Sequence, residues 1–156
     1  GSWHLIGHLQ TNKIKQAVTI FSLIHSVDSE RVLLEIEKQA AEQGKVQDIL
    51  LQVNVAQEES KFGLAVAELL PLAKLARGLE HIKLRGIMVI GPHTEDTEQV
   101  RKIFAQGYQQ FVALKTVVPE IDILSMGMSA DYLIAIEEGA NMVRIGSKIF
   151  GERIYR

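Results

Sequence analysis

The segment Ile49-Leu50-Leu51-Gln52-Val53 is an almost unbroken run of apolar residues, most of them branched. A strand buried on both faces has this composition, because helices cover a parallel sheet and leave no polar face. Similar short runs recur along the chain and predict a set of buried strands. The predicted strands are Trp3–Gly7, Ile20–Val27, Ile49–Val55, Leu84–Gly91, Ile123–Met128 and Met142–Ile145.

Longer segments with apolar residues at helical spacing lie between these runs. Two of them have clear boundary signals. Asp28-Ser29 begins a helical pattern that Gly44 ends, and Pro119 stops a second pattern that starts near Thr94 or Glu95. The predicted helices are Ser29–Gln43, Leu64–Arg77, Glu95–Val117 and Ala130–Glu138.

The alternation of strands and helices predicts an α/β fold with a parallel sheet and right-handed crossovers. A complete (β/α)₈ barrel needs roughly 250 residues, whereas this sequence has 156. We therefore expect a parallel (β/α) barrel that is incomplete, with about six of eight βα units. No linker or change in composition divides the chain, so residues 1–156 are expected to form one domain. An open sheet has two unpaired edges, which predicts self-association.

The composition excludes several classes of protein. The 17 Lys and Arg residues nearly balance the 19 Asp and Glu residues, so we expect no broad electrostatic binding of nucleic acid or anionic membrane. The absence of cysteine excludes disulfides, cysteine-bound zinc and a thiol nucleophile. No apolar run approaches the roughly 20 residues of a membrane helix, and nothing at the start reads as a signal peptide. These observations predict a cytoplasmic protein.

Two glycine-containing turns near the C-terminus are candidates for a ligand site. Ser125–Asp131 runs from a predicted strand into a predicted helix, with Ser129 as a candidate N-cap and Gly127 allowing a close approach of the backbone. Gly146-Ser147 follows the next strand. The N-termini of helices that follow two successive strands can bind a phosphate together. In (β/α) barrels, the recurrent phosphate site lies after the last two strands. The alternative interpretation is that both serines only cap helices.

Arg144 lies inside the apolar run Met142–Ile145, where a buried guanidinium is costly unless it is paired. It could form a structural ion pair with Glu137 or Asp131. It could equally contact the ring of a ligand whose phosphate is bound by the turn that follows. The sequence contains no P-loop, GxGxxG, GxSxG or HExxH motif. The residues by themselves therefore predict a phosphate-bearing ligand on the C-terminal face of the sheet and nothing more specific.

Several motifs resemble a known family. The segment Trp3-His4-Leu5-Ile6-Gly7-His8-Leu9-Gln10-Thr11-Asn12-Lys13 resembles the WHxIGxLQxNK signature of YggS-type (PROSC-like) pyridoxal phosphate homeostasis proteins. Further segments resemble the family in the same order and extend the likeness over nearly the whole chain. They are His25–Asp28, Gln52–Asn54 with Glu59–Gly63, Leu84–Met88, Leu124–Asp131 and Val143–Gly151.

The resemblance implies a barrel of the alanine-racemase N-domain type that binds pyridoxal 5′-phosphate (PLP). By similarity, Ser129, Gly146 and Ser147 contact the phosphate, with the backbone of Met126 and Gly127 assisting. Arg144 is expected to face the pyridine nitrogen. A guanidinium there keeps this nitrogen unprotonated, which weakens PLP as an electron sink. The resemblance therefore implies a non-catalytic protein that binds PLP and acts in vitamin B6 and amino-acid homeostasis.

The sequence departs from the family at its start. In the family, the lysine that forms the Schiff base lies on a first strand ahead of the tryptophan motif, and no lysine here matches it. We therefore expect a truncated form that binds PLP without a covalent bond. Two alternatives remain open at this stage. One is a PLP-dependent amino-acid racemase, and the other is a barrel isomerase or aldolase acting on a sugar phosphate.

Overall fold

The structure, a computed structural model, describes residues 2–59 and 62–146. Each of the six predicted strands overlaps an observed one. The strands are β1 (His4–Leu5), β2 (Leu23–Val27), β3 (Gln47–Val53), β4 (Ile82–Val89), β5 (Ile123–Met128) and β6 (Met142–Arg144). The helices are the short 3-10 helix η1 (Thr11–Lys13), α1 (Ile14–Ile20), α2 (Glu30–Glu42), α3 (Val66–Arg77), α4 (Thr97–Lys115) and α5 (Tyr132–Glu137).

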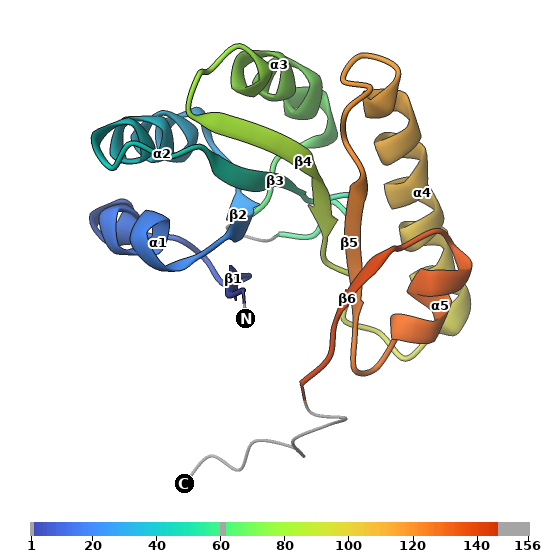
Figure 1. The fold of residues 1–156 in the computed structure, drawn as a ribbon. Coiled ribbons are helices and arrows are strands. Elements are labelled where there is room, and N and C mark those ends of the chain that lie inside the picture. The colour runs from blue at the N-terminus through green and yellow to red at the C-terminus, as the bar shows by residue number, and fades with distance from the viewer. Residues whose placement is uncertain (1, 60–61, 147–156) are drawn as a thin grey trace, which may run out of the picture.

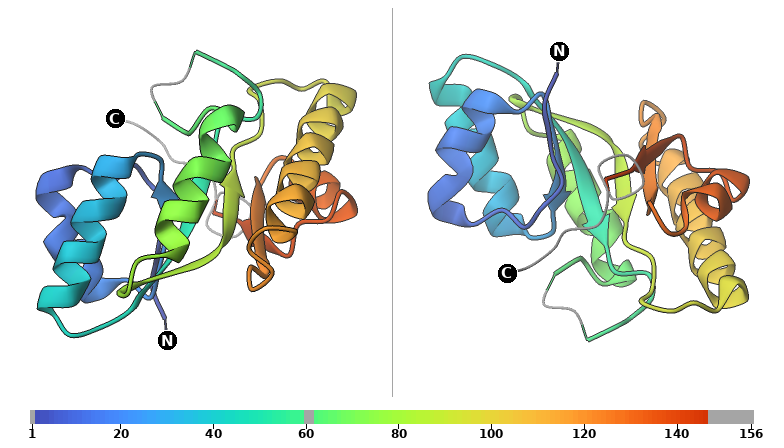
Figure 2. Two further views of the ribbon diagram at one scale, coloured as in Figure 1. Left: turned by 90° about the horizontal axis from the view of Figure 1, so that it is seen from above. Right: turned by 90° about the horizontal axis from the view of Figure 1, so that it is seen from below.

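The strands form a single parallel sheet in sequence order, from β1 to β6. Figure 1 shows the helices around one side of this curved sheet, and Figure 2 shows the same arrangement from above and below. Because β1 and β6 are the two ends of the order and do not pair with each other, the barrel is incomplete in this chain. Among the described residues, no helix is both long and apolar enough to cross a membrane.

The side chains of the strands alternate between two apolar clusters. The larger cluster lies between the sheet and the helices, and it includes Ile49, Leu51 and Phe104, all fully buried. The smaller cluster lies on the concave inner face. Its buried members are Leu23, Leu50, Met88 and Ile123. This division is the period-2 alternation of strands, so the inner face carries its own short apolar layer.

The helix α1 was not predicted, and the predicted strand Ile20–Val27 begins too early. The run from Val18 to Ile24 is rich in branched and aromatic residues, which favours a strand. In the structure, Ile14, Ala17 and Val18 are buried on one face of α1. Tertiary packing of this helical face overrides the local preference for a strand, so that β2 starts at Leu23.

The other helices lie close to their predicted bounds. Ser29 caps α2 as expected, since its hydroxyl accepts a hydrogen bond from the Val32 N–H at 3.1 Å. Asp96 caps α4, slightly later than predicted. Leu64, predicted to begin a helix, instead forms an isolated parallel bridge with Val53. The turn predicted at Ser147 lies outside the described residues.

The pairing of β3 with β4 contains an irregularity. Ile49 pairs with Leu84, but Leu50 pairs with Gly86, so Arg85 is an extra residue in β4. A bulge of this kind redirects a side chain. The Arg85 guanidinium reaches Asp48 at 2.8 Å and Asp122 at 3.0 Å, which closes the amino-terminal end of the inner face with an ion-pair cluster.

Candidate functional site

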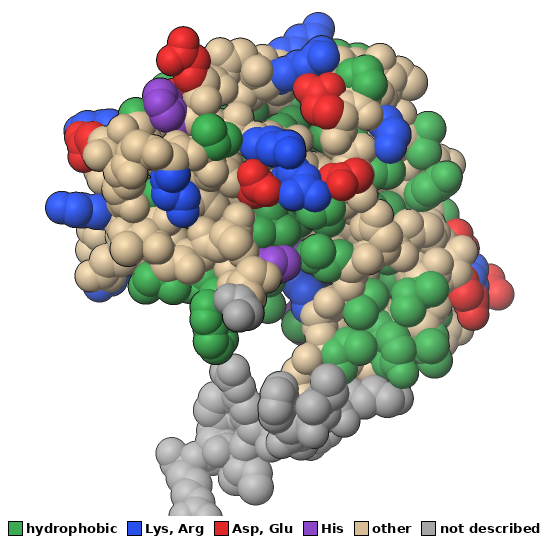
Figure 3. Space-filling model, in the orientation of Figure 1, with side chains coloured by type: hydrophobic (Ala, Val, Ile, Leu, Met, Phe, Trp, Pro, Cys, Tyr) green, Lys and Arg blue, Asp and Glu red, His purple; other side chains and the backbone are tan. Residues whose placement is uncertain are grey.

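A cavity of about 1410 Å³ opens on the concave side of the sheet at the carboxyl ends of the strands. Figure 3 shows this side, with histidine and Lys or Arg side chains at the hollow between the two halves of the molecule. The carboxyl ends of the strands are where barrels of this kind place their ligand sites. The cavity is lined by His4 and His25, by residues after β4 such as His93 and Thr94, by Met128–Asp131 and by Met142–Gly146.

Arg144, at the end of β6, lines this cavity and is 9% exposed. Its Nη1 donates to the Ser125 Oγ at 2.9 Å and to the Ser125 carbonyl oxygen at 3.3 Å, and its Nη2 donates to the Val89 carbonyl oxygen at 3.0 Å. Burial lowers the pKa of Arg144 to about 10, while the charge of Asp131 acts in the opposite direction. The guanidinium is therefore still a cation near neutral pH.

The ion pair considered for Arg144 is not formed within the described residues. Glu137 instead pairs with Arg101 at 2.7 Å. Asp131 accepts from the Met128 N–H at 2.7 Å and acts on Arg144 only through its charge. Among the described residues, a buried cation therefore faces the cavity with neutral oxygen partners and no carboxylate within ion-pair distance.

The two predicted turns meet directly. The Ser129 Oγ accepts a hydrogen bond from the Gly146 N–H at 3.0 Å. This contact joins the segment after β5 to the segment after β6 at the rim of the cavity, beside Arg144. The prediction that these turns lie together is thus confirmed in the described residues, and Ser147 lies outside them.

One detail of the predicted site is wrong, and a second residue of it has a packing role that the sequence did not predict. Ser129 is not the N-cap of α5, because Asp131 holds that position and Ser129 is used to join the two turns. Gly127 has a packing role. A Cβ atom there would lie 2.6 Å from the Ala135 Cβ, so the glycine, with φ +102°, allows α5 to pack against the end of β5.

Met126 also lies away from the cavity. Its side chain is fully buried in the cluster between the sheet and the helices, because it alternates with Ser125 along β5. Of the residues predicted for the cofactor, the described structure therefore brings Ser129, Arg144 and Gly146 to the cavity wall. Met126 and Gly127 support this wall from behind.

Sequence reasoning missed His25 and Ser125 as parts of the site. Both are buried, at 1% and 0% exposure, and the Ser125 Oγ lies 3.1 Å from the His25 Nδ1. The His25 Nε2 lies 3.2 Å from the His4 Nδ1. A signal was present, because each is a polar residue in a strand that was predicted to be buried, where most polar groups have a hydrogen-bond partner.

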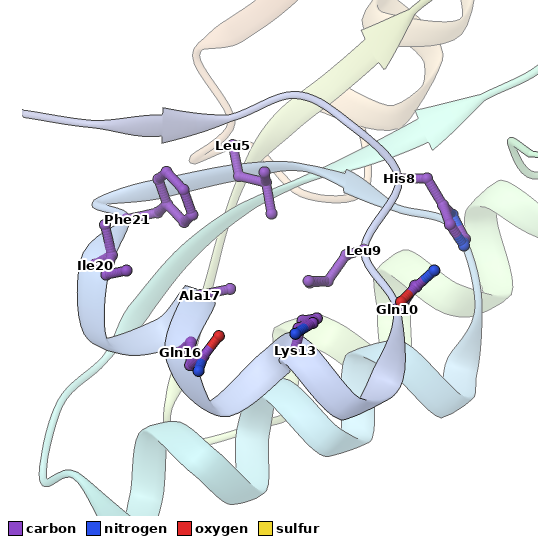
Figure 4. Close-up of a pocket in the computed structure, with 9 residues that line it drawn as sticks. All are labelled: Leu5, His8, Leu9, Gln10, Lys13, Gln16, Ala17, Ile20 and Phe21. Carbon is purple, nitrogen blue, oxygen red and sulfur yellow. The ribbon is translucent and has the colours of Figure 1, made fainter.

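A second hollow lies against α1, outside the curved sheet. Figure 4 shows its residues, including Leu5, Ala17 and Phe21 on the apolar side and Gln10 and Lys13 at the mouth. Lys13, which belongs to the tryptophan-containing motif, thus lines this hollow and not the cavity beside Arg144. Among the described residues, no group of three or more His, Cys, Asp or Glu side chains is placed to hold a metal ion.

The family model of the alanine racemase N-terminal domain matches residues 1–154. The chain belongs to this family. Among its curated relatives, the pyridoxal phosphate homeostasis protein of Aquifex aeolicus (strain VF5) is 43% identical over 157 residues, which cover 98% of this chain and 68% of the relative. The protein of the same name from Escherichia coli (strain K12) is 40% identical over 154 residues, which cover 98% of this chain and 65% of that protein. The chain thus spans about two thirds of the length of these relatives.

Solved structures agree with this assignment to the family. PipY of Synechococcus elongatus PCC7942, with PLP bound, is 35% identical with a TM-score of 0.88, and the match covers 96% of this chain and 70% of PipY. An alanine racemase of Clostridium difficile 630 shares the fold at a TM-score of 0.76 and 19% identity, over 97% of this chain and 40% of the racemase. The expected fold class is therefore confirmed.

Proposed function

We propose that this chain binds PLP in the concave cavity and acts in PLP homeostasis. The observation that carries the proposal is the joint position of three features at one cavity wall. The turn after β5 is bonded to the turn after β6 through Ser129 and Gly146, and the buried Arg144 guanidinium lies beside them. The relatives named above as pyridoxal phosphate homeostasis proteins, and PipY with PLP bound, support it.

The residues present fit the chemistry of this cofactor. A phosphate needs N–H and O–H donors at turns. The segments carrying Ser129 and Gly146 place such turns at the cavity wall, where the Gly146 N–H donates to the Ser129 Oγ in this structure. A pyridine nitrogen is a hydrogen-bond acceptor, and Arg144 can only donate. The guanidinium remains charged near neutral pH, so it favours an unprotonated ring nitrogen. PLP supplies an electrophilic aldehyde and a ring that stabilises carbanions when its nitrogen is protonated.

This donor arrangement favours binding over amino-acid chemistry. A ring nitrogen that stays unprotonated is a weak electron sink, and no lysine is among the described residues that line the cavity. We therefore propose a non-catalytic role in which Ser129 and Gly146 hold the phosphate, Arg144 orients the ring, and Ser147 adds to the phosphate contacts. A racemase-like activity is the second candidate, since an alanine racemase shares the fold.

The test is a titration of the chain with PLP, followed by fluorescence quenching and by the melting temperature. We expect saturable binding and a raised melting temperature. Pyridoxal, which lacks the phosphate, and ribose 5-phosphate, which lacks the ring, serve as controls and should bind at least about tenfold more weakly. Equal stabilisation by ribose 5-phosphate, or no response to PLP, would reject the proposal. Racemisation of alanine in the presence of PLP would favour the second candidate.

Self-association of the chain remains a prediction, and the open edges of the sheet support it. β1 and β6 each lack a second partner strand within the described residues, and unpaired edges favour pairing with other chains. Light scattering over a range of concentrations should show an average mass that rises with concentration. A constant monomer mass would contradict it.

A further inference from the structure

A series of hydrogen-bonded polar groups crosses the inner face of the sheet, buried at His25, Ser125 and Arg144 and exposed at His4. It runs from His4 on β1 through His25 on β2 and Ser125 on β5 to Arg144 on β6. His25 and Ser125 are 100 residues apart in the sequence and lie on strands separated by β3 and β4. The curvature of the sheet brings them within hydrogen-bond distance, so the chain depends on the barrel shape.

The His25 ring is neutral in this position. Burial, followed by the charges of His4 and Arg144, lowers the pKa of His25 to about 3. A neutral imidazole has one N–H donor and one acceptor nitrogen. Both nitrogens lie near a partner, Nδ1 at 3.1 Å from the Ser125 Oγ and Nε2 at 3.2 Å from the His4 Nδ1. The neutral His25 ring can therefore accept a hydrogen bond at one nitrogen and donate one from the other.

The charge of Arg144 sets the direction of the hydrogen bonds. Its Nη1 can only donate, so the Ser125 Oγ accepts at 2.9 Å. The field of the guanidinium then orients the single hydroxyl proton of Ser125 away from the cation and toward the His25 Nδ1. This direction requires the His25 tautomer that accepts at Nδ1 and carries its proton on Nε2, from which it donates to the His4 Nδ1 at 3.2 Å. The hydrogen bonds that link these four side chains thus all run in one direction, from Arg144 to His4.

This arrangement leaves part of Arg144 available to a ligand. A guanidinium has five N–H groups in a fixed fork. The bonds to Ser125 and Val89 occupy at most three of them. Among the described residues, the remaining N–H groups have no hydrogen-bond partner, and Arg144 lines the cavity. Because the fork is rigid, fixing Nη1 also fixes the direction of the other donors.

We propose that Ser125 and His25 are positioning residues that fix the Arg144 guanidinium so that a remaining N–H group meets the ring nitrogen of the bound cofactor. The proposal rests on the proposed function. Neither residue touches the ligand through this role. Ser125 anchors the fork of the arginine, and His25 holds the Ser125 hydroxyl in the orientation that accepts from it.

The test compares PLP with its 1-deaza analogue, in which a C–H group replaces the ring nitrogen. The full chain should bind PLP more tightly than the analogue. Ser125→Ala should weaken PLP binding about tenfold and leave the affinity for the analogue within about twofold, because only PLP uses the oriented N–H group. Ser125→Thr keeps the hydroxyl and should restore most of the preference. His25→Phe should act like Ser125→Ala with a smaller loss.

Ser26→Ala is the matched control. Ser26 is also a serine in a buried strand, at 2% exposure, but its Oγ has no hydrogen-bond partner among the described residues. This variant should keep the wild-type affinities for both ligands. If Ser125→Ala and Ser26→Ala behave alike, or if Ser125→Ala weakens both ligands equally, the positioning role is wrong while the proposed function stands. Failure of the wild-type chain to bind PLP would instead overturn both.

A second measurement does not depend on the ligand. Nitrogen-15 NMR of the imidazole distinguishes a ring nitrogen that carries a proton from one that does not. In the wild-type chain, His25 should be neutral, with Nε2 protonated and Nδ1 acting as acceptor. A His25 ring protonated on Nδ1 would overturn the proposed direction of the hydrogen bonds, because Nδ1 would then donate to the Ser125 Oγ and the serine proton would not point toward His25.

Discussion

Two arginines lie at opposite ends of the inner face of the sheet, and their partners differ in kind. Arg85, at the amino-terminal end, pairs with Asp48 and Asp122, and the hydrogen bonds that its guanidinium donates to these carboxylates raise the pKa of Arg85. Arg144, at the carboxyl end, has only a hydroxyl and two carbonyl oxygens as hydrogen-bond partners among the described residues, and burial lowers its pKa to about 10.

The difference teaches how to distinguish a structural charge from a functional one. The Arg85 cluster is compensated within the protein, so it has no need of a ligand and serves to close one end of the barrel. Arg144 is buried with no carboxylate within ion-pair distance among the described residues, which costs stability. A ligand that brings an acceptor and a phosphate to this end completes the site. The following predictions test that contrast.

The largest effect is expected at the bulge that directs Arg85. A Cβ atom on Gly86 would lie 1.7 Å from the Ile123 carbonyl oxygen, which belongs to the neighbouring strand backbone. Gly86→Ala should therefore lower the free energy of unfolding by more than about 4 kcal/mol or prevent folding. Urea unfolding measures this. Gly44→Ala is the control, because nothing lies within 4 Å of that position, and it should cost about 1–2 kcal/mol.

Removal of the Arg144 charge should weaken PLP binding and leave the stability of the fold nearly unchanged. Arg144→Met replaces a buried cation by an apolar side chain of similar length, so the free energy of unfolding should stay within about 1 kcal/mol of wild type. The affinity for PLP should fall between about tenfold and a hundredfold, because a charge-assisted hydrogen bond is lost. A large loss of stability with unchanged PLP affinity would show that Arg144 is structural and would contradict the contrast.

Removal of the Arg85 charge should lower the stability of the fold and leave PLP binding nearly unchanged. Arg85→Met leaves Asp48 and Asp122 close together without their shared cation. The free energy of unfolding should fall by about 2 kcal/mol, less than for a fully buried pair, since the Arg85 side chain is 26% exposed. PLP affinity, measured by the same titration, should stay within about twofold of wild type. A drop in affinity as large as that of Arg144→Met would remove the distinction between the two ends.

The smallest expected effect is the change that His25 causes in the free energy of unfolding with pH. The pKa of His25 is lowered from 6.5 to about 3, so below pH 6.5 the unfolded chain binds a proton that the folded chain does not bind. The contribution of His25 to stability is therefore complete above about pH 6.5 and decreases toward pH 3. Between pH 7 and pH 5 the loss should be about 1–2 kcal/mol. His25→Phe should show a shallower slope in urea unfolding across this range, and an unchanged slope would contradict the prediction.

Much of the fold could be predicted from local sequence pattern. The continuous apolar runs gave the six strands because a strand in a covered parallel sheet has no polar face. Ser29, Gly44 and the spacing of apolar residues located α2 within a residue or two. The helix α1 could not be found in this way, because Val18 and Ile20 favour strands locally, and only the burial of Ile14, Ala17 and Val18 on one face makes the segment helical.

The site was predicted in part. The glycine and serine positions after β5 and β6 indicated two turns, and the contact of Ser129 with Gly146 joins them. The packing role of Gly127 was not predicted, because the contact of α5 with β5 is a tertiary contact that local spacing does not encode. Ser125 and His25 carried a signal as polar residues in apolar strands, but the sequence did not say which partner each would find.

The amino-acid sequence by itself determined the order of strands, the parallel class of the sheet, the turns that follow the last strands, and the burial of Arg144. These properties depend on the spacing of apolar residues along the chain and on the backbone conformations that single residues such as glycine can adopt. Both are local features of the sequence. Only the tertiary structure decided that Arg144 has no carboxylate partner among the described residues and that β2 and β5 exchange a hydrogen bond through His25 and Ser125. The curvature of the whole sheet sets these distances, and no short segment contains it.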